Sequence, residues 1–505
     1  MANQKIIDAK AAVVDEIANK MKESSSYVLF EYRGLTVSDT NELRKILRES
    51  GSELKVYKNT LTARALEKLN IDLGDNLNGP KAIAFGKDAI APIKALNDFA
   101  PIDHYVWEML RKRSVPEELI TGKNVSNKEK FMALAKVFPE FIGNPVYEWV
   151  HLDLRRGLGM KDAILNEESA ESIWEESLKI LATDNKRPQG LVKEQNIELM
   201  CSTDDPVDLL GEHKEANAAF GRTVIRPTWR PDKAVNIYAA SWNEYIGKLE
   251  KRFNASINSV DELVEVLKAS HKYFEANGAV ASDHGIEYPL SGDATKEQAE
   301  SAFKKARSGK ALSRAEIDDY MSYITVKIAE MDAEANWVFQ MHIGAVRDIR
   351  SSLFNTLGPD SGGDVSDHMI DIVKPLGRFL DKLDGKLKVV LYCLDPHHQS
   401  DLATVARAFG AKVRLGSAWW LNDTPIGMRR QLEYIGSVDL LYNFAGMVSD
   451  SRKILSYSSR FEMFRRILAD VVAQHVLRGQ FPASAAEKLI TSSAVRGICI
   501  SIYLR

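Results

Sequence analysis

Cysteine is scarce in this 505-residue chain, which contains only Cys201, Cys393 and Cys499. Their wide spacing forms neither a disulfide framework nor a cysteine metal motif, and it suits a reducing cytoplasm. A surplus of charge is missing too, since 67 Lys and Arg residues stand against 70 Asp and Glu residues. The chain as a whole therefore gives no electrostatic reason to expect nucleic acid or an anionic membrane as its partner.

Long apolar runs are absent as well. No stretch is long enough to span a bilayer, and the first five residues lack the apolar centre of a signal peptide. We expect a cytoplasmic protein with no membrane partner, and the sequence leaves open whether it forms a homo-oligomer. The length predicts two or three domains, or one large barrel with an additional unit.

The later part of the chain repeats a pattern of short apolar segments that end in polar, charged or aromatic residues. Segments of helical periodicity separate them, at 260–274, 296–304, 315–329 and 402–409. Strands that alternate with helices indicate βαβ units and a parallel sheet. The expected strands are residues 197–202, 223–229, 278–281, 337–341, 388–394, 412–416 and 438–444.

Polar residues at the carboxyl end of every strand are typical of the active face of a (β/α)₈ barrel. Such a barrel needs eight strands, and only seven are found. The last of them, 438–444, leads into Asp450 and Arg452. Opposite charges that end a buried strand are costly unless they have a role, so we predict that both residues are functional.

The first hundred residues follow a different pattern. Helical periodicity predicts helices over 9–22, 36–50, 58–69 and 89–98, and apolar runs predict strands over 27–32, 53–57 and 82–85. This is a small α+β unit. Its sequence motifs resemble those of the bacterial ribosomal stalk-base protein of the large subunit, the L-ten family. The motifs that carry the resemblance are Phe30-Glu31-Tyr32-Arg33-Gly34-Leu35, Val56-Tyr57-Lys58-Asn59-Thr60-Leu61 and Gly79-Pro80-Lys81-Ala82-Ile83.

The resemblance implies that residues 1–100 dock on ribosomal RNA through Arg33, Lys58, Asn59 and Arg64. Cations and an amide at loop and helix starts suit the positioning of phosphates. The same residues also fit an ordinary solvated surface, where most basic residues lie. The helix that carries the acidic stalk dimers in that family has no counterpart in this chain.

From residue 102 onward, a second set of motifs resembles uronate isomerase, a family of the amidohydrolase superfamily. The resemblance covers residues 102–505. The implied fold is α/β: a (β/α)₈ TIM-type barrel of the amidohydrolase kind, with its first strand missing, preceded by the small α+β ribosomal-protein domain. The motifs are Asp103-His104-Tyr105, Arg230-Pro231-Asp232-Lys233, Ser282-Asp283-His284-Gly285, Gln340-Met341-His342, Ser417-Ala418-Trp419-Trp420 and Ser449-Asp450-Ser451-Arg452.

The implied reaction is an aldose–ketose isomerisation, of D-glucuronate to D-fructuronate and of D-galacturonate to D-tagaturonate. It requires an acid/base group, a polarised carbonyl and an anchor for the sugar carboxylate. The resemblance implies a divalent metal, zinc or manganese. The candidate residues are Asp450, Tyr105 and His104 for catalysis, Asp450, His342 and His284 for the metal, and Arg452, Arg230, Arg347, Trp419 and Trp420 for the substrate.

Several of these residues have a structural alternative. His284 fits a hydrogen-bonding role in the core as well as a ligand role, and His151 fits a structural role. Asp204 and Asp205 favour a helix N-cap, because Asp is preferred there. His397 and His398 favour a solvated loop, since adjacent side chains in an extended chain point in opposite directions.

The chain departs from the isomerase pattern at one place. Uronate isomerases begin their barrel with a strand ending in His-x-His, whereas none of the ten histidines here lies two residues from another. Losing that strand leaves two unpaired parallel edges and too few ligands for a closed metal site. The two resemblances meet near residues 99–102 without a linker. The chain is therefore an isomerase, impaired or not, an RNA-binding protein with a passenger barrel, or a chimera.

Overall fold

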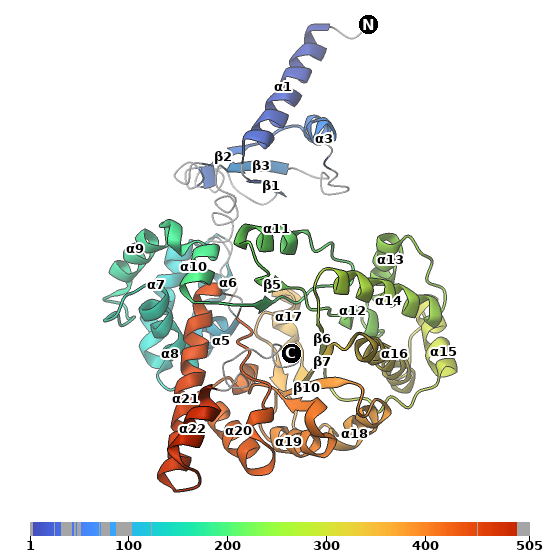
Figure 1. The fold of residues 1–505 in the computed structure, drawn as a ribbon. Coiled ribbons are helices and arrows are strands. Elements are labelled where there is room, and N and C mark those ends of the chain that lie inside the picture. The colour runs from blue at the N-terminus through green and yellow to red at the C-terminus, as the bar shows by residue number, and fades with distance from the viewer. Residues whose placement is uncertain are drawn as a thin grey trace. The chain divides into compact units, whose positions relative to one another are not determined.

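The structure is a computed structural model of the chain. It describes residues 4–24, 26–31, 43, 44, 47, 52–69, 71, 81–86, 104–122, 124–451 and 453–491 (Figure 1). Contacts divide the chain into two units, Met1–Asp103 with Trp107–Leu134, and His104–Val106 with Ala135–Arg505. Among the described residues, no helix combines the length and the apolar character needed to cross a membrane.

The first unit contains a three-stranded antiparallel sheet in the order β1-β3-β2. Helices α1 and α3 pack together through an apolar cluster that includes Ile17, Met21 and Leu66 with Ile83 and Phe85 of the sheet. The helices predicted over 9–22 and 58–69 and the three predicted strands are confirmed. The helix predicted over 36–50 lies mostly outside the described residues, and the one over 89–98 lies wholly outside them. The elements are α1 (Gln4–Glu23), β1 (Ser26–Glu31), β2 (Glu53–Lys55), α3 (Asn59–Lys68) and β3 (Lys81–Gly86).

A helical region precedes the parallel strands. Its elements are α5 (His104–Lys112), α6 (Glu117–Thr121), α7 (Asn127–Val137), η2 (Phe138–Phe141), α8 (Pro145–Leu152), η3 (Asp153–Gly157), α9 (Ala170–Leu181), η4 (Asp184–Lys186) and α10 (Pro188–Glu194).

The second unit is organised around parallel strands. Strands β6, β7, β10 and β11 form a four-stranded sheet in the order β11-β10-β7-β6, and β4 pairs with β5. Single bridges from Trp229 to Asp204 and to Ser282 continue the β4–β5 pair into β6. The strands are β4 (Met200–Cys201), β5 (Ile225–Arg226), β6 (Ala281–Ile286), β7 (Val338–Ile343), β10 (Lys388–Cys393) and β11 (Val413–Leu415).

Helices alternate with these strands, and Figure 1 shows α14, α16, α18 and α19 outside β6, β7 and β10. The elements between and after the strands are α11 (Gly211–Phe220), α12 (Asp232–Val235), α13 (Trp242–Phe253), α14 (Val260–Ala276), α15 (Lys296–Arg307), α16 (Arg314–Ala335), β8 (Ala345–Val346), α17 (Ser351–Leu357), β9 (Val365–Ser366), α18 (Val373–Lys382), α19 (His398–Phe409), η5 (Gly410–Lys412), η6 (Trp420–Asn422), α20 (Pro425–Val438), η7 (Leu441–Asn443), η8 (Ile454–Ser456), α21 (Tyr457–Leu477) and α22 (Ala483–Thr491).

The four predicted helices of this part are confirmed as α14, α15, α16 and α19. Local sequence explains their starts: Thr295 caps α15 together with Gln298, and Ser313 caps α16 together with Glu316. In each case the side chain at the cap accepts a hydrogen bond from a backbone N–H that has no partner within the helix.

Five of the seven predicted strands are confirmed, the one predicted over 278–281 shares only Ala281 with β6, and the seventh, over 438–444, is wrong. Helix α20 continues to Val438, and the side chains of Leu440 and Tyr442 are exposed rather than buried. The apolar run thus finishes a helix and crosses the surface before Phe444 turns inward. One strand-like feature remains, because the Ala445 N–H donates to the Leu415 carbonyl of β11 at 2.9 Å.

Side-chain alternation in the sheet decides which residues share a face. Asp283 of β6 is in register with Gln340 of β7 and shares its face with His342, whereas Ser282 and His284 lie on the other face. Each of β6, β7 and β10 is mostly buried, while Cys201 on β4 is exposed. Within the described part of the chain, no strand pairs with the outer edge of β4. This α/β arrangement agrees with the expected kind of fold, and closure into an eight-stranded barrel remains a prediction.

Gly416 provides a stability test of this core. A Cβ atom there would lie 2.2 Å from the ring of Tyr392, which is buried and stacked on His342. We expect Gly416→Ala to lower the free energy of unfolding by about 1–3 kcal/mol, measured by urea denaturation.

Gly377 in α18 is the matched control, because a Cβ atom there meets nothing. Gly377→Ala should raise the free energy of unfolding by about 0.4–1 kcal/mol through better helix propensity. Equal effects of the two substitutions would contradict the packing at Gly416.

Candidate functional site

A cluster of charged groups lies where β5, β6 and β7 end. The Arg230 guanidinium contacts Asp283 at 2.6 Å and lies 3.7 Å from Asp232. Across from it, Nδ1 of His342 lies 2.7 Å from Oδ1 of the same Asp283 carboxylate. The short loop after β5 and the inward faces of β6 and β7 thus bring three segments of the chain to one carboxylate.

Three buried polar atoms in this cluster lack a hydrogen-bond partner: Nε of Arg230, Oδ1 of Asp283 and Nδ1 of His342. Oδ1 of Asp283 and Nδ1 of His342 nonetheless lie 2.7 Å apart and face each other. Buried polar groups without a partner are costly and uncommon in folded proteins. Since two of the three atoms face each other, Nε of Arg230 is the one that a polar ligand would satisfy.

The carboxylates of the cluster differ in their affinity for protons. Burial alone would raise the pKa of Asp283, but the His342 ring and the Arg230 guanidinium hold it well below its usual range. Burial raises the pKa of Asp232 to about 6, and Arg230 acts in the opposite direction. Asp283 is therefore a fixed negative charge at neutral pH, while Asp232 titrates closer to it.

Aromatic side chains form one wall of the cluster. The His342 ring stacks on Tyr392 at 4.4 Å and meets Trp419 edge-on at 4.8 Å. Trp419 and Trp420 both have left-handed backbone angles, with φ of 51° and 46°. Such angles are strained for bulky residues and persist where the surroundings enforce them, often at functional sites.

Tyr105 and His104, both predicted to be catalytic, lie in the same neighbourhood. Their rings stack at 4.3 Å, and His104 also meets Trp420 edge-on at 5.7 Å. Burial raises the pKa of the Tyr105 hydroxyl well above its ordinary value, while Arg460 opposes burial. The Tyr105 hydroxyl therefore keeps its proton at neutral pH.

The buried pair Asp423–Arg460 was missed by the sequence interpretation. Nη1 of Arg460 donates to Asp423 at 2.7 Å, and both side chains are almost completely buried. The guanidinium also lies 3.3 Å from the centre of the Trp149 ring. Burial raises the pKa of Asp423 to about 6, with Arg460 opposing it. No local pattern marks this pair, because 37 residues separate its members.

Asp450 is placed near these groups, but not as a buried charge. It is exposed, with φ of 46°, so the argument from the cost of burial was wrong. After burial and Arg460, its carboxylate contributes to the raised pKa values of Tyr105 and Asp423, so it acts on the same neighbourhood. Arg452 lies outside the described residues.

Arg347, like Arg230, already has a carboxylate partner. It contacts Asp364 at 2.8 Å, and its guanidinium lies over the Trp420 ring at 4.8 Å. Its charge is therefore partly compensated within the protein, as that of Arg230 is.

His284, for which the sequence left a ligand role and a core role open, makes the contacts of a core residue. Its Nε2 atom bonds with the Ser282 hydroxyl at 2.7 Å, and its ring stacks on Phe339 at 3.9 Å. Burial lowers the pKa of His284 to about 3, so the ring is neutral. It faces away from Asp283 because adjacent residues of a strand alternate.

Two other structural alternatives are resolved. His151 is structural as predicted, since it bonds with the Tyr147 carbonyl at 3.0 Å and accepts from the Leu165 N–H at 3.1 Å. Asp204 and Asp205 do not cap α11, which begins later, at Gly211. Asp205 instead accepts from the Tyr245 hydroxyl at 2.6 Å.

The predicted metal ligands do not fit a divalent-ion site. Among the described residues, the only group of three metal-binding side chains is His368, Asp395 and His397. His342, His284 and Asp450 form no such group, and the unpaired Nδ1 of His342 faces Asp283 instead. His397, interpreted as part of a solvated loop, therefore belongs to a cluster.

The predicted RNA-binding residues lie on the first unit. Lys58 immediately precedes α3 and is exposed, Asn59 begins the helix and is half-buried, and Arg64 is exposed one turn later. Arg33 lies outside the described residues.

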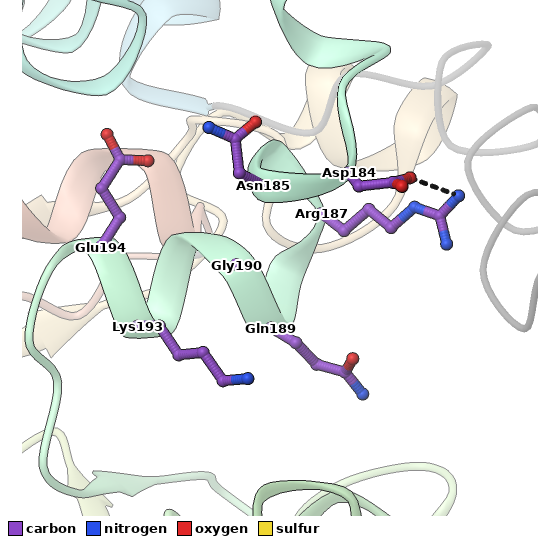
Figure 2. A pocket seen from close by; sticks show the side chains of 7 residues that line it. All are labelled: Asp184, Asn185, Arg187, Gln189, Gly190, Lys193 and Glu194. Atoms are coloured by element: carbon purple, nitrogen blue, oxygen red, sulfur yellow. Dashed lines mark ion pairs between the residues drawn. The ribbon is translucent and has the colours of Figure 1, made fainter.

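A surface hollow lies on η4 and α10, and mostly polar residues line it through the apolar parts of their side chains as well as their polar groups (Figure 2). Arg187 there pairs with Asp184 at 3.0 Å. No predicted site residue lines it, so the strand ends remain the candidate site. Its lining residues are Asp184, Asn185, Arg187, Gln189, Gly190, Lys193 and Glu194.

Two family models match the chain. The model described as "Glucuronate isomerase" matches residues 94–502, and the model described as "Ribosomal protein L10" matches residues 5–101. These are the two resemblances expected from the sequence motifs.

Known proteins agree with the larger match. A uronate isomerase of Thermotoga maritima is 49% identical over 388 residues, covering 77% of this chain and 85% of the relative. One of Cellvibrio japonicus is 39% identical over 392 residues, covering 75% and 82%. A crystal structure of the T. maritima uronate isomerase superposes with a TM-score of 0.77 at 45% identity, covering 81% of this chain and 89% of that one.

The Asp423–Arg460 pair gives a prediction about stability. Arg460→Met would leave the Asp423 carboxylate buried without its partner, so the free energy of unfolding should fall by about 3–5 kcal/mol in urea denaturation. Replacing both residues, as Asp423→Leu with Arg460→Met, should recover a large part of the loss.

The control is another Arg–Asp pair that lies on the surface, Arg429–Asp470. Arg429→Met should cost less than about 1 kcal/mol. A similar loss in both single variants would contradict a special cost of burial at Arg460.

Proposed function

This chain belongs to the glucuronate isomerase family of enzymes, and we propose that it converts D-glucuronate to D-fructuronate and D-galacturonate to D-tagaturonate. The observation that carries the proposal is the buried polar cluster of Arg230, Asp283 and His342 beside an aromatic wall, in which Nε of Arg230 lacks a hydrogen-bond partner. A uronate has a carboxylate and several hydroxyl groups, which match these donors and acceptors.

In this proposal, Arg230 binds the sugar carboxylate. A guanidinium offers five donors, so it can keep its contact with Asp283 and still bind a second carboxylate. His342 donates to or accepts from a sugar oxygen next to it. Trp419 and Trp420 stack on the sugar ring or chain, as flat apolar surfaces do against C–H groups. Arg347 and Arg452 remain further candidates for anion binding.

The proton transfers use Asp450 and Tyr105. Asp450 takes the proton from C2 of the aldose, and Tyr105 donates its proton to the carbonyl oxygen at C1, which gives an enediol. The enediol then returns a proton from the oxygen at C2 to Tyr105, while Asp450 delivers its proton to C1. The ketose forms and both side chains recover their starting states. His104, stacked on Tyr105, holds that ring in place.

The family reaction suggests a divalent metal, which we expect to be zinc or manganese. Because the predicted ligands are not assembled, none of the steps above passes through a metal. We take residues 102–505 as the isomerase domain and residues 1–100 as a separate domain. Cysteine usage favours the cytoplasm as its location.

Turnover provides the test. The purified chain, assayed with and without added zinc or manganese, should isomerise glucuronate or galacturonate. Asp450→Asn should lower kcat by about 100-fold or more, as expected for the loss of an acid/base group.

Asp261→Asn is the control, because Asp261 is an exposed carboxylate on α14 that contacts Lys296. Its kcat should equal that of the parent chain. A folded chain with no turnover of either sugar would refute the proposed activity, and turnover unaffected by Asp450→Asn would refute the role of Asp450.

A second function rests on the match of residues 5–101 to ribosomal protein L10. We propose that this part binds ribosomal RNA through Lys58, Asn59, Arg64 and Arg33. Lys58 and Arg64 are exposed near the start of α3, which supports this proposal. Exposed cations can contact RNA phosphates without any change in the apolar core.

RNA binding would depend on salt. For the full chain and a large-subunit ribosomal RNA fragment, the double substitution Lys58→Ala with Arg64→Ala should weaken binding. It should also reduce the slope of log affinity against log salt by about 1 for each lost phosphate contact. Lys68→Ala is the control, since Lys68 contacts Asp15 within the same unit. No binding by the parent chain at low salt would refute this function.

A further inference from the structure

Two loops at the carboxyl end of β10 bring together three side chains that the proposed isomerisation does not use. His368 follows β9, whereas Asp395 and His397 follow β10 in the turn that leads into α19. Their candidate ligand atoms all lie within 4.8 Å of one another. The donors are two imidazoles and one carboxylate, and they come from segments 27 residues apart in sequence.

Asp395 is the centre of the group. Its Oδ1 atom lies 3.0 Å from Nδ1 of His397 and 3.8 Å from Nδ1 of His368. The Asp395 side chain is almost fully buried, with 7% of its surface exposed, whereas both imidazoles are open to solvent. The buried carboxylate and the two solvent-exposed imidazoles thus provide three of the ligands that a cation site needs.

The Asp395 carboxylate has acceptor positions available for a cation. The backbone N–H of His397 donates to Oδ1 at 2.8 Å. A carboxylate has about four lone-pair sites, so this bond leaves others free to bind an ion.

His398 supplies an independent observation. Its ring stacks on His368 at 5.6 Å with an angle of 12° between the planes. Only 6% of its surface is exposed, and its Nδ1 atom has no hydrogen-bond partner. An unpaired buried imidazole nitrogen beside an aspartate and two more histidines points to a ligand held there rather than to a solvated loop.

We propose that His368, Asp395 and His397 bind a divalent first-row transition-metal ion, Zn²⁺, at the end of β10. Imidazole and carboxylate are ligands that suit this ion, at about 2.0–2.2 Å from the metal. The present spread of the donor atoms is wider than a bound ion requires, and the two exposed histidine side chains can close it by rotation. Water completes the coordination.

The ion would join two parts of the second unit. Strand β9 pairs with β8, and Arg347 and Asp364 beside that ribbon contact each other. Binding to His368 after β9 and to Asp395 after β10 would fix this ribbon to the turn before α19. The bound ion would therefore hold the loop that carries Arg347 in place, and it takes no part in the proton transfers proposed above.

Cobalt provides the spectroscopic probe. The full chain, freed of metal with a chelator, would be titrated with Co²⁺, and the visible d–d bands recorded. We expect a saturable band at micromolar Co²⁺ that Zn²⁺ displaces. The single variants His368→Ala and His397→Ala should each weaken the Co²⁺ affinity by about 10-fold or more. Added Zn²⁺ should also raise the Tm of the parent chain by a few degrees, and less in the variants.

His475→Ala is the matched control, because His475 contacts Gln480 and Phe481 at the end of α21, outside the cluster. It should bind Co²⁺ as the parent chain does. Bands that are identical in the parent chain and in both cluster variants, or binding only at millimolar Co²⁺, would overturn the proposal. The measurement uses no sugar, so its outcome does not depend on whether the chain is an active isomerase.

Discussion

The candidate site depends on the register between β6 and β7. Pairing Asp283 with Gln340 places Asp283 and His342 on the same face of the sheet, one pleat apart. A shift of β6 by a single residue would turn Asp283 away from Arg230 and His342 and bring Ser282 or His284 to that face instead. The register is fixed from the other side, where Ser282 bonds with Asp332 and His284 stacks on Phe339, all of them buried. The buried polar network on one face of the sheet thus determines which side chains lie on the opposite face, at the candidate site.

Sequence patterns predicted the elements of this fold more reliably than the details of its site. Strands such as β7 and β10 were found because a short apolar run between helices has few other interpretations. The run 438–444 misled because its residues suit a strand equally well, and only the exposure of Leu440 and Tyr442 reveals that it crosses the surface. Burial of a run cannot be derived from its composition, since the helices that cover it are distant in sequence.

The same limit explains the site. Tyr105, His104, Trp419, Trp420, His342 and Arg230 were found through motifs, and the structure brings them near one another. Asp423 with Arg460, and His368 with Asp395 and His397, required the fold, because each group joins loops that are far apart in sequence. His284 shows the reverse error: a motif identifies a residue type, whereas strand alternation decides the direction of its side chain.

The two tryptophans with left-handed backbone angles also constrain how this protein can change. Angles of this kind cost roughly 1–3 kcal/mol each for residues other than glycine, and the loop keeps them because Asn422 donates to the Leu394 carbonyl at 2.6 Å. A glycine at position 419 or 420 would relieve that strain and remove the aromatic wall at the same time. Selection for heat resistance and selection for sugar binding therefore act in opposite directions on these two codons.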